Sequence, residues 1–145
     1  MIVRPLLPAD LDALLALDGA TNPHPWTAAQ WQDSLAQHLC LGLEYHGILA
    51  GLAVAMLLPD EAELLLIAVD PARQGHGLGR ELLAALGTEL TAQQRVNLFL
   101  EVRASNLRAQ QFYAAAGLRE IGRRKNYYPT TNGREDALLL AGALS

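Results

Sequence analysis

The sequence predicts a mixed α/β domain, in which a mostly antiparallel central sheet of about seven strands is flanked by about four helices. Short apolar runs alternate with turn residues through the first half of the chain, which is typical of antiparallel strands. Other stretches carry apolar residues at every third or fourth position, and this spacing indicates amphipathic helices that cover a sheet.

The size and composition indicate one domain over residues 1–145 that needs no disulfide or metal to hold its core. Eleven basic and fifteen acidic residues give a formal charge of −4, which argues against direct binding to nucleic acid or an anionic membrane. A single cysteine, Cys40, excludes an internal disulfide framework and a multi-cysteine zinc site. The N-terminal residues do not resemble a secretion signal and no apolar run is long enough to span a membrane, so we expect a soluble cytoplasmic protein without metal.

In the N-terminal quarter we expect a short strand at residues 2–4 and two helices. The first helix opens at residues 8–10, where a proline and an aspartate form a typical start signal. Residues 21–26 contain two prolines and therefore cannot form a regular element. Thr27 is a good N-cap for the second helix, which carries Trp31.

Three apolar runs follow, at residues 39–45, 48–58 and 62–69, and short turns separate them. This pattern favours an antiparallel meander. Residues 64–69 do not alternate between apolar and polar side chains, so we expect a strand that is buried on both faces.

The second half of the chain is expected to alternate helices and strands after a glycine-rich turn. In chain order, the expected elements are a helix at about residues 78–90, a strand at 96–102, a helix at 106–116 that ends at Gly117, and two strands at 119–127 and 136–141 on either side of a turn at 129–133.

The glycine-rich turn, with Gly75, Gly77 and Gly79, lies between a buried strand and a helix. Glycines expose backbone N–H groups, and a helix N-terminus adds partial positive charge, so this turn suits a phosphate or pyrophosphate. It lacks the lysine of a nucleotide P-loop, and Arg80 stands where a dinucleotide fingerprint needs its third glycine. Because Glu101 lies near where a ribose-binding acid could sit, the missing glycine weakens the dinucleotide interpretation rather than excluding it. A flexible turn without a ligand is a further alternative.

Glu101 places a carboxylate in the apolar strand at 96–102. An unpaired buried carboxylate is costly, so this residue is either a general base or one half of a structural ion pair with Arg103 or another arginine. Asn106, Gln110 and Tyr113 fall on one stripe of the next helix, where two of them can contact separate parts of one elongated ligand. A simple packing role for Tyr113 is the alternative.

Several motifs resemble those of the GCN5-related N-acetyltransferase (GNAT) superfamily. The turn at residues 74–79 fits Q-x-x-G-x-G, which marks the superfamily. The strings L-E-V-R-A-S-N at 100–106 and N-Y-Y-P-T-T at 126–131, with P-W at 25–26, resemble one branch, the bacterial RimI-type enzymes. These acetylate the N-terminal alanine of small-subunit ribosomal protein eighteen. Departures from the pattern of the branch are Asp18, Leu118 and Lys125.

The resemblance implies a GNAT fold and a role for each matching residue. Glu101 would be the general base and Tyr113 the proton donor, with acetyl-CoA as cosubstrate and a small-subunit ribosomal protein N-terminus as acceptor. The residues implied to bind acetyl-CoA are Ile67, Ala68 and Val69 for the acetyl and pantetheine arm, Gly75, His76, Gly77, Leu78, Gly79 and Arg80 for the pyrophosphate, and Asn106.

Two other functions remain open from the sequence. The protein could be a GNAT enzyme for lysine side chains or small-molecule amines, or a non-catalytic acyl-CoA-binding module. The presence of both Glu101 and Tyr113 favours catalysis over mere binding. We expect direct transfer without an acetyl-enzyme, because Cys40 lies outside every motif and is expected to be a buried apolar residue. Tyr127 and Tyr128 either shape the acceptor groove or pack across a hairpin.

Overall fold

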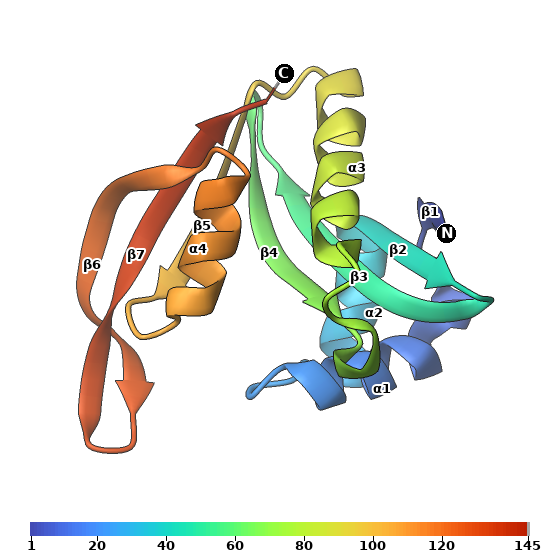
Figure 1. Cartoon of the computed structure of the whole chain (residues 1–145), viewed down its shortest axis with the longest axis horizontal. Coiled ribbons are helices and arrows are strands. Elements are labelled where there is room, and N and C mark those ends of the chain that lie inside the picture. Colours follow the sequence, from blue (N-terminus) through green and yellow to red (C-terminus); the bar gives the residue numbers. More distant parts are fainter. Residues whose placement is uncertain (145) are drawn as a thin grey trace.

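Seven strands form one sheet in the order β1-β2-β3-β4-β5-β7-β6 in the computed structural model, which describes residues 1–144 (Figure 1). The strands are β1 (Ile2–Pro5), β2 (Leu39–Tyr45), β3 (Ile48–Leu57), β4 (Glu61–Val69), β5 (Asn97–Arg103), β6 (Arg119–Thr130) and β7 (Gly133–Ala143). Every neighbouring pair is antiparallel except β4 and β5. The expected mixed, mostly antiparallel sheet with four helices is confirmed.

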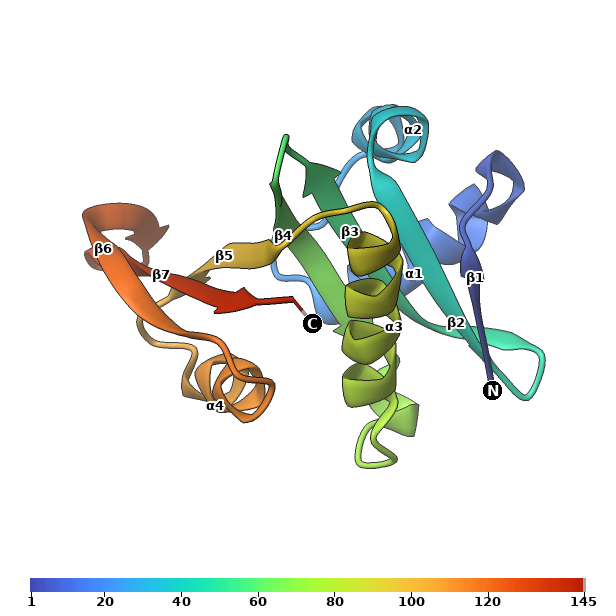
Figure 2. The same cartoon turned by 90° about the horizontal axis from the view of Figure 1, so that it is seen from above.

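The helices cover both faces of this sheet. They are α1 (Leu11–Thr21), α2 (Ala28–Gln37), α3 (Leu78–Ala92) and α4 (Leu107–Ala115). Seen from above, α3 and α4 lie on one face, and α1 and α2 lie on the other (Figure 2). Each face has its own apolar cluster. No helix within residues 1–144 is long and apolar enough to cross a membrane.

Local sequence signals account for the helix boundaries. Thr27 caps α2, because its Oγ1 accepts a hydrogen bond from the Gln30 amide and the Gln30 side chain accepts one from the Thr27 amide. A 3-10 turn at Pro8–Asp10 leads into α1, as the proline signal predicts. The apolar stripe expected of α3 is also confirmed, since Leu78, Leu82, Leu83, Leu86 and Leu90 are all buried.

The sheet opens at its centre, between β4 and β5. These strands pair only at Glu61–Asn97, Ala62–Leu98 and Glu63–Phe99 and then separate. The register of β4 against β3 shifts here, with Val54 opposite Leu66 and Ala55 opposite Leu64, so that Leu65 is an extra, bulged residue. Because a β-bulge bends its strand, β4 turns away from β5 and leaves a gap between two halves of the sheet.

Two expectations about strands are wrong in detail. Residues 64–69 are not buried on both faces, because β5 has already diverged, and from Leu65 onward the residues are only half-buried. The last two strands are longer than predicted and reach into the expected turn at 129–133. Backbone pairing continues to Thr130 opposite Gly133, so only two residues remain between the strands.

Candidate functional site

A cleft of about 580 Å³ lies beside the second half of β4, between the start of α3 and α4. Its wall also includes the end of α1, at Thr21, Asn22 and Pro23. The cleft brings together residues that lie far apart in the sequence. The expected site residues that line it are Ile67, Ala68, Val69, Gly75, Gly77, Leu78, Gly79, Arg80, Asn106 and Tyr113.

The glycine-rich turn presents the start of α3 to this cleft. Gly75 and Gly77 have φ values of +87° and +74°, in the left-handed region that favours glycine. Gly77 is the N-cap, so the amides of the first turn of α3 have no intrahelical partners. Gly79 is needed for close packing, since a Cβ there would lie 3.3 Å from Phe112 Cε1. The turn therefore presents unpaired backbone N–H groups and a helix N-terminus to the cleft, an arrangement that suits an anion.

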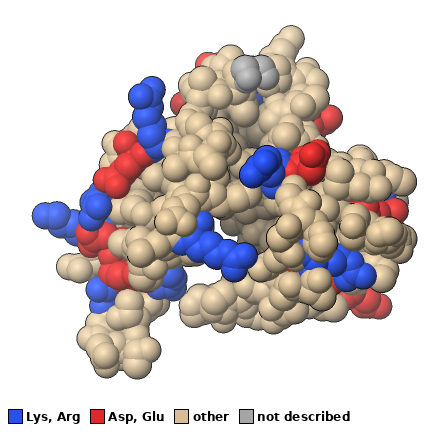
Figure 3. All heavy atoms as spheres, viewed as in Figure 1, with Lys and Arg blue, Asp and Glu red and all other residues tan. Residues whose placement is uncertain are grey.

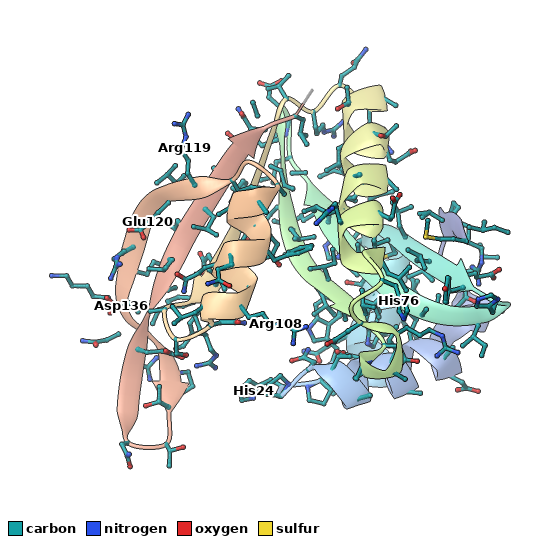
Figure 4. All side chains as sticks on the ribbon, in the orientation of Figure 1. His24, His76, Arg108, Arg119, Glu120 and Asp136 are labelled. Atoms are coloured by element: carbon teal, nitrogen blue, oxygen red, sulfur yellow. The ribbon has the colours of Figure 1, made fainter. Side chains whose placement is uncertain are left out.

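Not every residue expected around this turn faces the cleft. His76 is absent from the lining, and its imidazole lies 6.3 Å, centroid to centroid, from the ring of Tyr45 (Figure 4). Arg73, which flanks the turn in the sequence, forms an ion pair of 2.8 Å with Asp70 instead. Only Arg80 of the two flanking arginines lines the cleft.

Arg108 is a cleft residue that sequence reasoning missed, and it contacts Gln74, the first residue of the glycine-rich motif. Arg108 lies in the first turn of α4 (Figure 4), and its Nη2 donates a hydrogen bond of 3.0 Å to Gln74 Oε1. The Gln74 amide nitrogen in turn lies 3.3 Å from the Val69 carbonyl oxygen. Arg108 follows Asn106 by two positions, and that spacing at a helix start was the available signal.

Helix α4 places Asn106 and Tyr113 in the cleft. Asn106 caps the helix through a 3.1 Å hydrogen bond from the Ala109 amide to its Oδ1. Tyr113 is 9% exposed and lines the cleft. Burial raises the pKa of Tyr113 to about 12. Gln110 does not join them, because its side chain donates to the Arg103 and Ala104 carbonyls.

Glu101 approaches the gap from the opposite face. Leu100 and Val102 belong to the cluster beneath α3 and α4, so Glu101 between them faces the other side of the sheet. Its side chain is 16% exposed and its Oε1 lies 2.9 Å from Arg124 Nε. An ion pair with an arginine was one of the two expectations, and the partner is Arg124 rather than Arg103.

The hairpin of β6 and β7 and the α1–α2 connection meet on the face of Glu101. Arg103 links them: its Nη1 donates to the Pro129 carbonyl and to Glu135, and its Nη2 lies 3.3 Å from His24 Nε2 (Figure 4). The Arg103 guanidinium also lies over the ring of Tyr128, 4.5 Å from its centroid. Burial, followed by the charge of Glu101, raises the pKa of Tyr128.

The surface around the gap is hollowed, and basic side chains lie on its rim (Figure 3). A second groove of about 630 Å³ runs between α3 and α4 and shares Arg80, Arg108 and Phe112 with the cleft. Within the part of the chain that the structure describes, no group of three or more His, Cys, Asp or Glu residues is placed to hold a metal.

This fold and cleft define the class of protein, and the comparisons agree. The model of the Acetyltransferase (GNAT) family matches residues 11–118, which is most of the chain. The chain therefore belongs to the GNAT family of acetyltransferases.

Within the family, the chain is similar to bacterial enzymes of the RimI type, and the resemblance drawn from the motifs is confirmed. It is 40% identical over 137 residues to the [ribosomal protein bS18]-alanine N-acetyltransferase of Escherichia coli K12, with 94% of this chain and 93% of that protein covered. The same enzyme of Haemophilus ducreyi is 35% identical over 142 residues, with 97% and 98% covered.

Solved structures agree with the fold. The crystal structure of the ribosomal-protein-S18-alanine N-acetyltransferase from Escherichia coli superposes with a TM-score of 0.92 at 39% identity, covering 99% of this chain and 94% of that one. Ard1 from Thermoplasma volcanium has a TM-score of 0.88 at 23% identity, covering 99% and 97%, and supports the fold alone.

Proposed function

We propose that this protein transfers the acetyl group of acetyl-CoA to the N-terminal amine of a protein that begins with alanine, in the cytoplasm. The acceptor we propose is a small-subunit ribosomal protein, because the relatives of 35–40% identity carry that activity in their names. The observation that carries the proposal is the gap in the sheet. A cleft lined by the glycine-rich turn and Tyr113 lies beside this gap on one face of the sheet, and Glu101 faces the other side.

Acetyl-CoA fits the residues of this cleft. The first-turn amides of α3 and the side chains of Arg80 and Arg108 suit its pyrophosphate. Beyond Glu63, the backbone groups that β4 directs toward β5 have no strand partner within residues 1–144, so they can bind the amides of an extended pantetheine arm. An N–H group near Val69 would polarise the acetyl carbonyl.

Glu101 is proposed as the base and Tyr113 as the acid of a direct transfer. The amine nitrogen attacks the thioester carbonyl carbon, an N–C bond forms, the C–S bond breaks, and Glu101 takes the amine proton directly or through water. Burial raises the pKa of Tyr113 to about 12, so its phenol is protonated and available as a proton donor at neutral pH. Tyr113 is proposed to donate that proton to the thiolate as the C–S bond breaks, and solvent returns a proton to the phenolate.

The energetics of the acceptor favour an N-terminal amine. A free α-amino group has a pKa of about 7.8 and lysine about 10.4, so neutralising them at pH 7 costs about 1.1 and 4.6 kcal/mol, respectively. A covalent acetyl-enzyme on Cys40 has no support, since this thiol is buried beside α2 in the other apolar cluster and burial raises its pKa to about 11. Direct transfer to the amine is therefore proposed.

The test incubates the protein with acetyl-CoA and three acceptors, followed by mass spectrometry of the products. The acceptors are a basic peptide that begins with alanine, the same peptide with a blocked N-terminus and an internal lysine, and spermidine. We expect acetylation of the free N-terminus. Preference for the blocked peptide or spermidine would assign another amine substrate, and binding of acetyl-CoA without any turnover would assign a binding module.

The roles of the two groups are tested with Glu101→Gln and Tyr113→Phe. Each is expected to lower kcat about 10²–10⁴-fold, while Glu120→Gln, on an exposed part of β6, is expected to leave kcat unchanged. Full turnover by the double variant Glu101→Gln/Tyr113→Phe would refute both assignments.

A further inference from the structure

The ion pair of Glu101 with Arg124 spans the whole width of β7. Arg124 is paired with Ala137 of β7, whereas Glu101 is paired with Leu139 of the same strand. Neighbouring strands are about 4.8 Å apart, so β5 and β6 are separated by about twice that distance. Only a long side chain can cover it, and Arg124 Nε nevertheless lies 2.9 Å from Glu101 Oε1.

The residues around Arg124 leave room for its side chain to cross β7 and hold the guanidinium in place. Ala137 stands between Arg124 and Arg103 in the register and is completely buried, so a small side chain lies where the arginine crosses. The regular pairing of β6 is interrupted directly after Arg124, and Asn126 in the interruption has a φ of +53°. The Arg124 guanidinium also lies 5.3 Å from the centroid of the Tyr127 ring, which supports it from a second side.

The charge of Arg124 also acts on a second carboxylate, that of Glu63. Glu63 forms the last β4–β5 pair before the gap, opposite Phe99, two residues before Glu101. Burial, followed by the charge of Glu101, raises the pKa of Glu63, and Arg124 opposes that effect. One guanidinium therefore offsets the negative charge of two carboxylates at the end of the β4–β5 pairing.

Resting on the proposed function, in which Glu101 is the base, we propose that Arg124 is a positioning residue for catalysis. It holds Oε1 of Glu101 and leaves Oε2 as the oxygen that takes the proton of the acceptor amine. Arg103 does not share this role, because its guanidinium is occupied by Glu135, the Pro129 carbonyl and His24. Without Arg124 the base would be misplaced, and a shift of about 1 Å can lower the rate about 10²-fold. Binding of the cosubstrate would not change.

The experiment is a double-mutant cycle on turnover of the alanine-starting peptide, with Arg124→Gln, Glu101→Gln and the double variant. Arg124→Gln is expected to lower kcat about 10–100-fold and to leave the KM for acetyl-CoA within about twofold. In the Glu101→Gln background it is expected to change kcat less than about twofold, because the group through which it acts is gone. The matched control is Arg123→Gln, the preceding arginine, which pairs with Glu120 and Asp136 instead, and it is expected to retain full turnover.

Chemical rescue separates positioning from a structural role. Millimolar guanidinium is expected to restore turnover of Arg124→Ala at least several-fold and to do nothing for Glu101→Gln. Equal losses from Arg124→Gln in both backgrounds, or turnover no lower than that of Arg123→Gln, would overturn the inference even if Glu101→Gln is inactive. Full turnover by Glu101→Gln itself would remove the base assignment in the proposed function, and this inference with it.

Discussion

Asp18 offers the sharpest test of how the fold builds one wall of the cleft. Its carboxylate is completely buried at the end of α1 and accepts three hydrogen bonds. Oδ2 accepts from the Trp26 amide at 2.8 Å and from the Trp31 indole at 3.0 Å, and Oδ1 accepts from the Asn22 side chain at 3.0 Å. The substitution Asp18→Ala removes every one of these acceptors.

The expected loss of stability follows from which donors can reach water. Trp31 is completely buried, so its indole N–H is left unpaired at a cost of about 2–3 kcal/mol. Trp26 and Asn22 are half-buried and can be partly rehydrated, which reduces their cost to about 1 kcal/mol each. The total is about 4 kcal/mol, a large part of the 5–15 kcal/mol typical of a domain, and corresponds to about 10–15 °C in the melting temperature.

Thermal unfolding followed by circular dichroism measures this loss, with Asp12→Ala as the matched control. Asp12 lies on the same helix but is exposed, so its removal is expected to cost only a few tenths of a kcal/mol. Titration with acetyl-CoA below the melting temperature should also show weaker binding by Asp18→Ala, because Asn22 and Pro23 line the cleft. A melting temperature within about 3 °C of the control would refute the reasoning.

Three further outcomes are expected at the site. Gly77→Ala and Gly47→Ala introduce the same backbone strain, because both glycines have φ near +75° with open space at Cβ. Each substitution should therefore cost about 1 kcal/mol of stability. Only Gly77→Ala should weaken the binding of acetyl-CoA, which calorimetric titration measures. Because burial raises the pKa of Tyr113 to about 12, the phenol stays protonated, and a pH profile of kcat should show no alkaline loss from this group below about pH 10. Glu63 has a raised pKa in the folded state, so its contribution to stability is present at low pH and lost as pH rises through that pKa; Glu63→Gln should therefore raise the melting temperature at pH 7, with the gain shrinking toward pH 4.

Features that depend on local periodicity could be predicted from the sequence. The leucines of α3 recur at helical spacing, and Thr27 stands three residues before Gln30, so both the buried stripe and the cap follow from neighbouring residues. The glycine-rich turn that leads into α3 could be predicted for the same reason, because its glycines and the following helix are contiguous in the chain.

Features that depend on register between distant strands could not be predicted. The bulge at Leu65 and the separation of β4 from β5 arise from pairing, to which an unbroken apolar run gives no clue. The partner of Glu101 depends on the alignment of β6 across β7, so the sequence suggested the nearby Arg103 and the structure selects Arg124. The resemblance implies that His76 lies at the pyrophosphate with the rest of residues 75–80, whereas its ring lies 6.3 Å, centroid to centroid, from that of Tyr45.

The short pairing between β4 and β5 has a consequence for the stability of the sheet with and without a ligand. Three residue pairs join the two halves of the sheet, and beyond them the edge of β4 that faces β5 has no strand partner within residues 1–144. If the thioester arm lies along that free edge, it acts as a temporary strand made of something other than polypeptide. Binding of acetyl-CoA then stabilises the fold by mass action. Release of coenzyme A leaves this edge of β4 without a partner again.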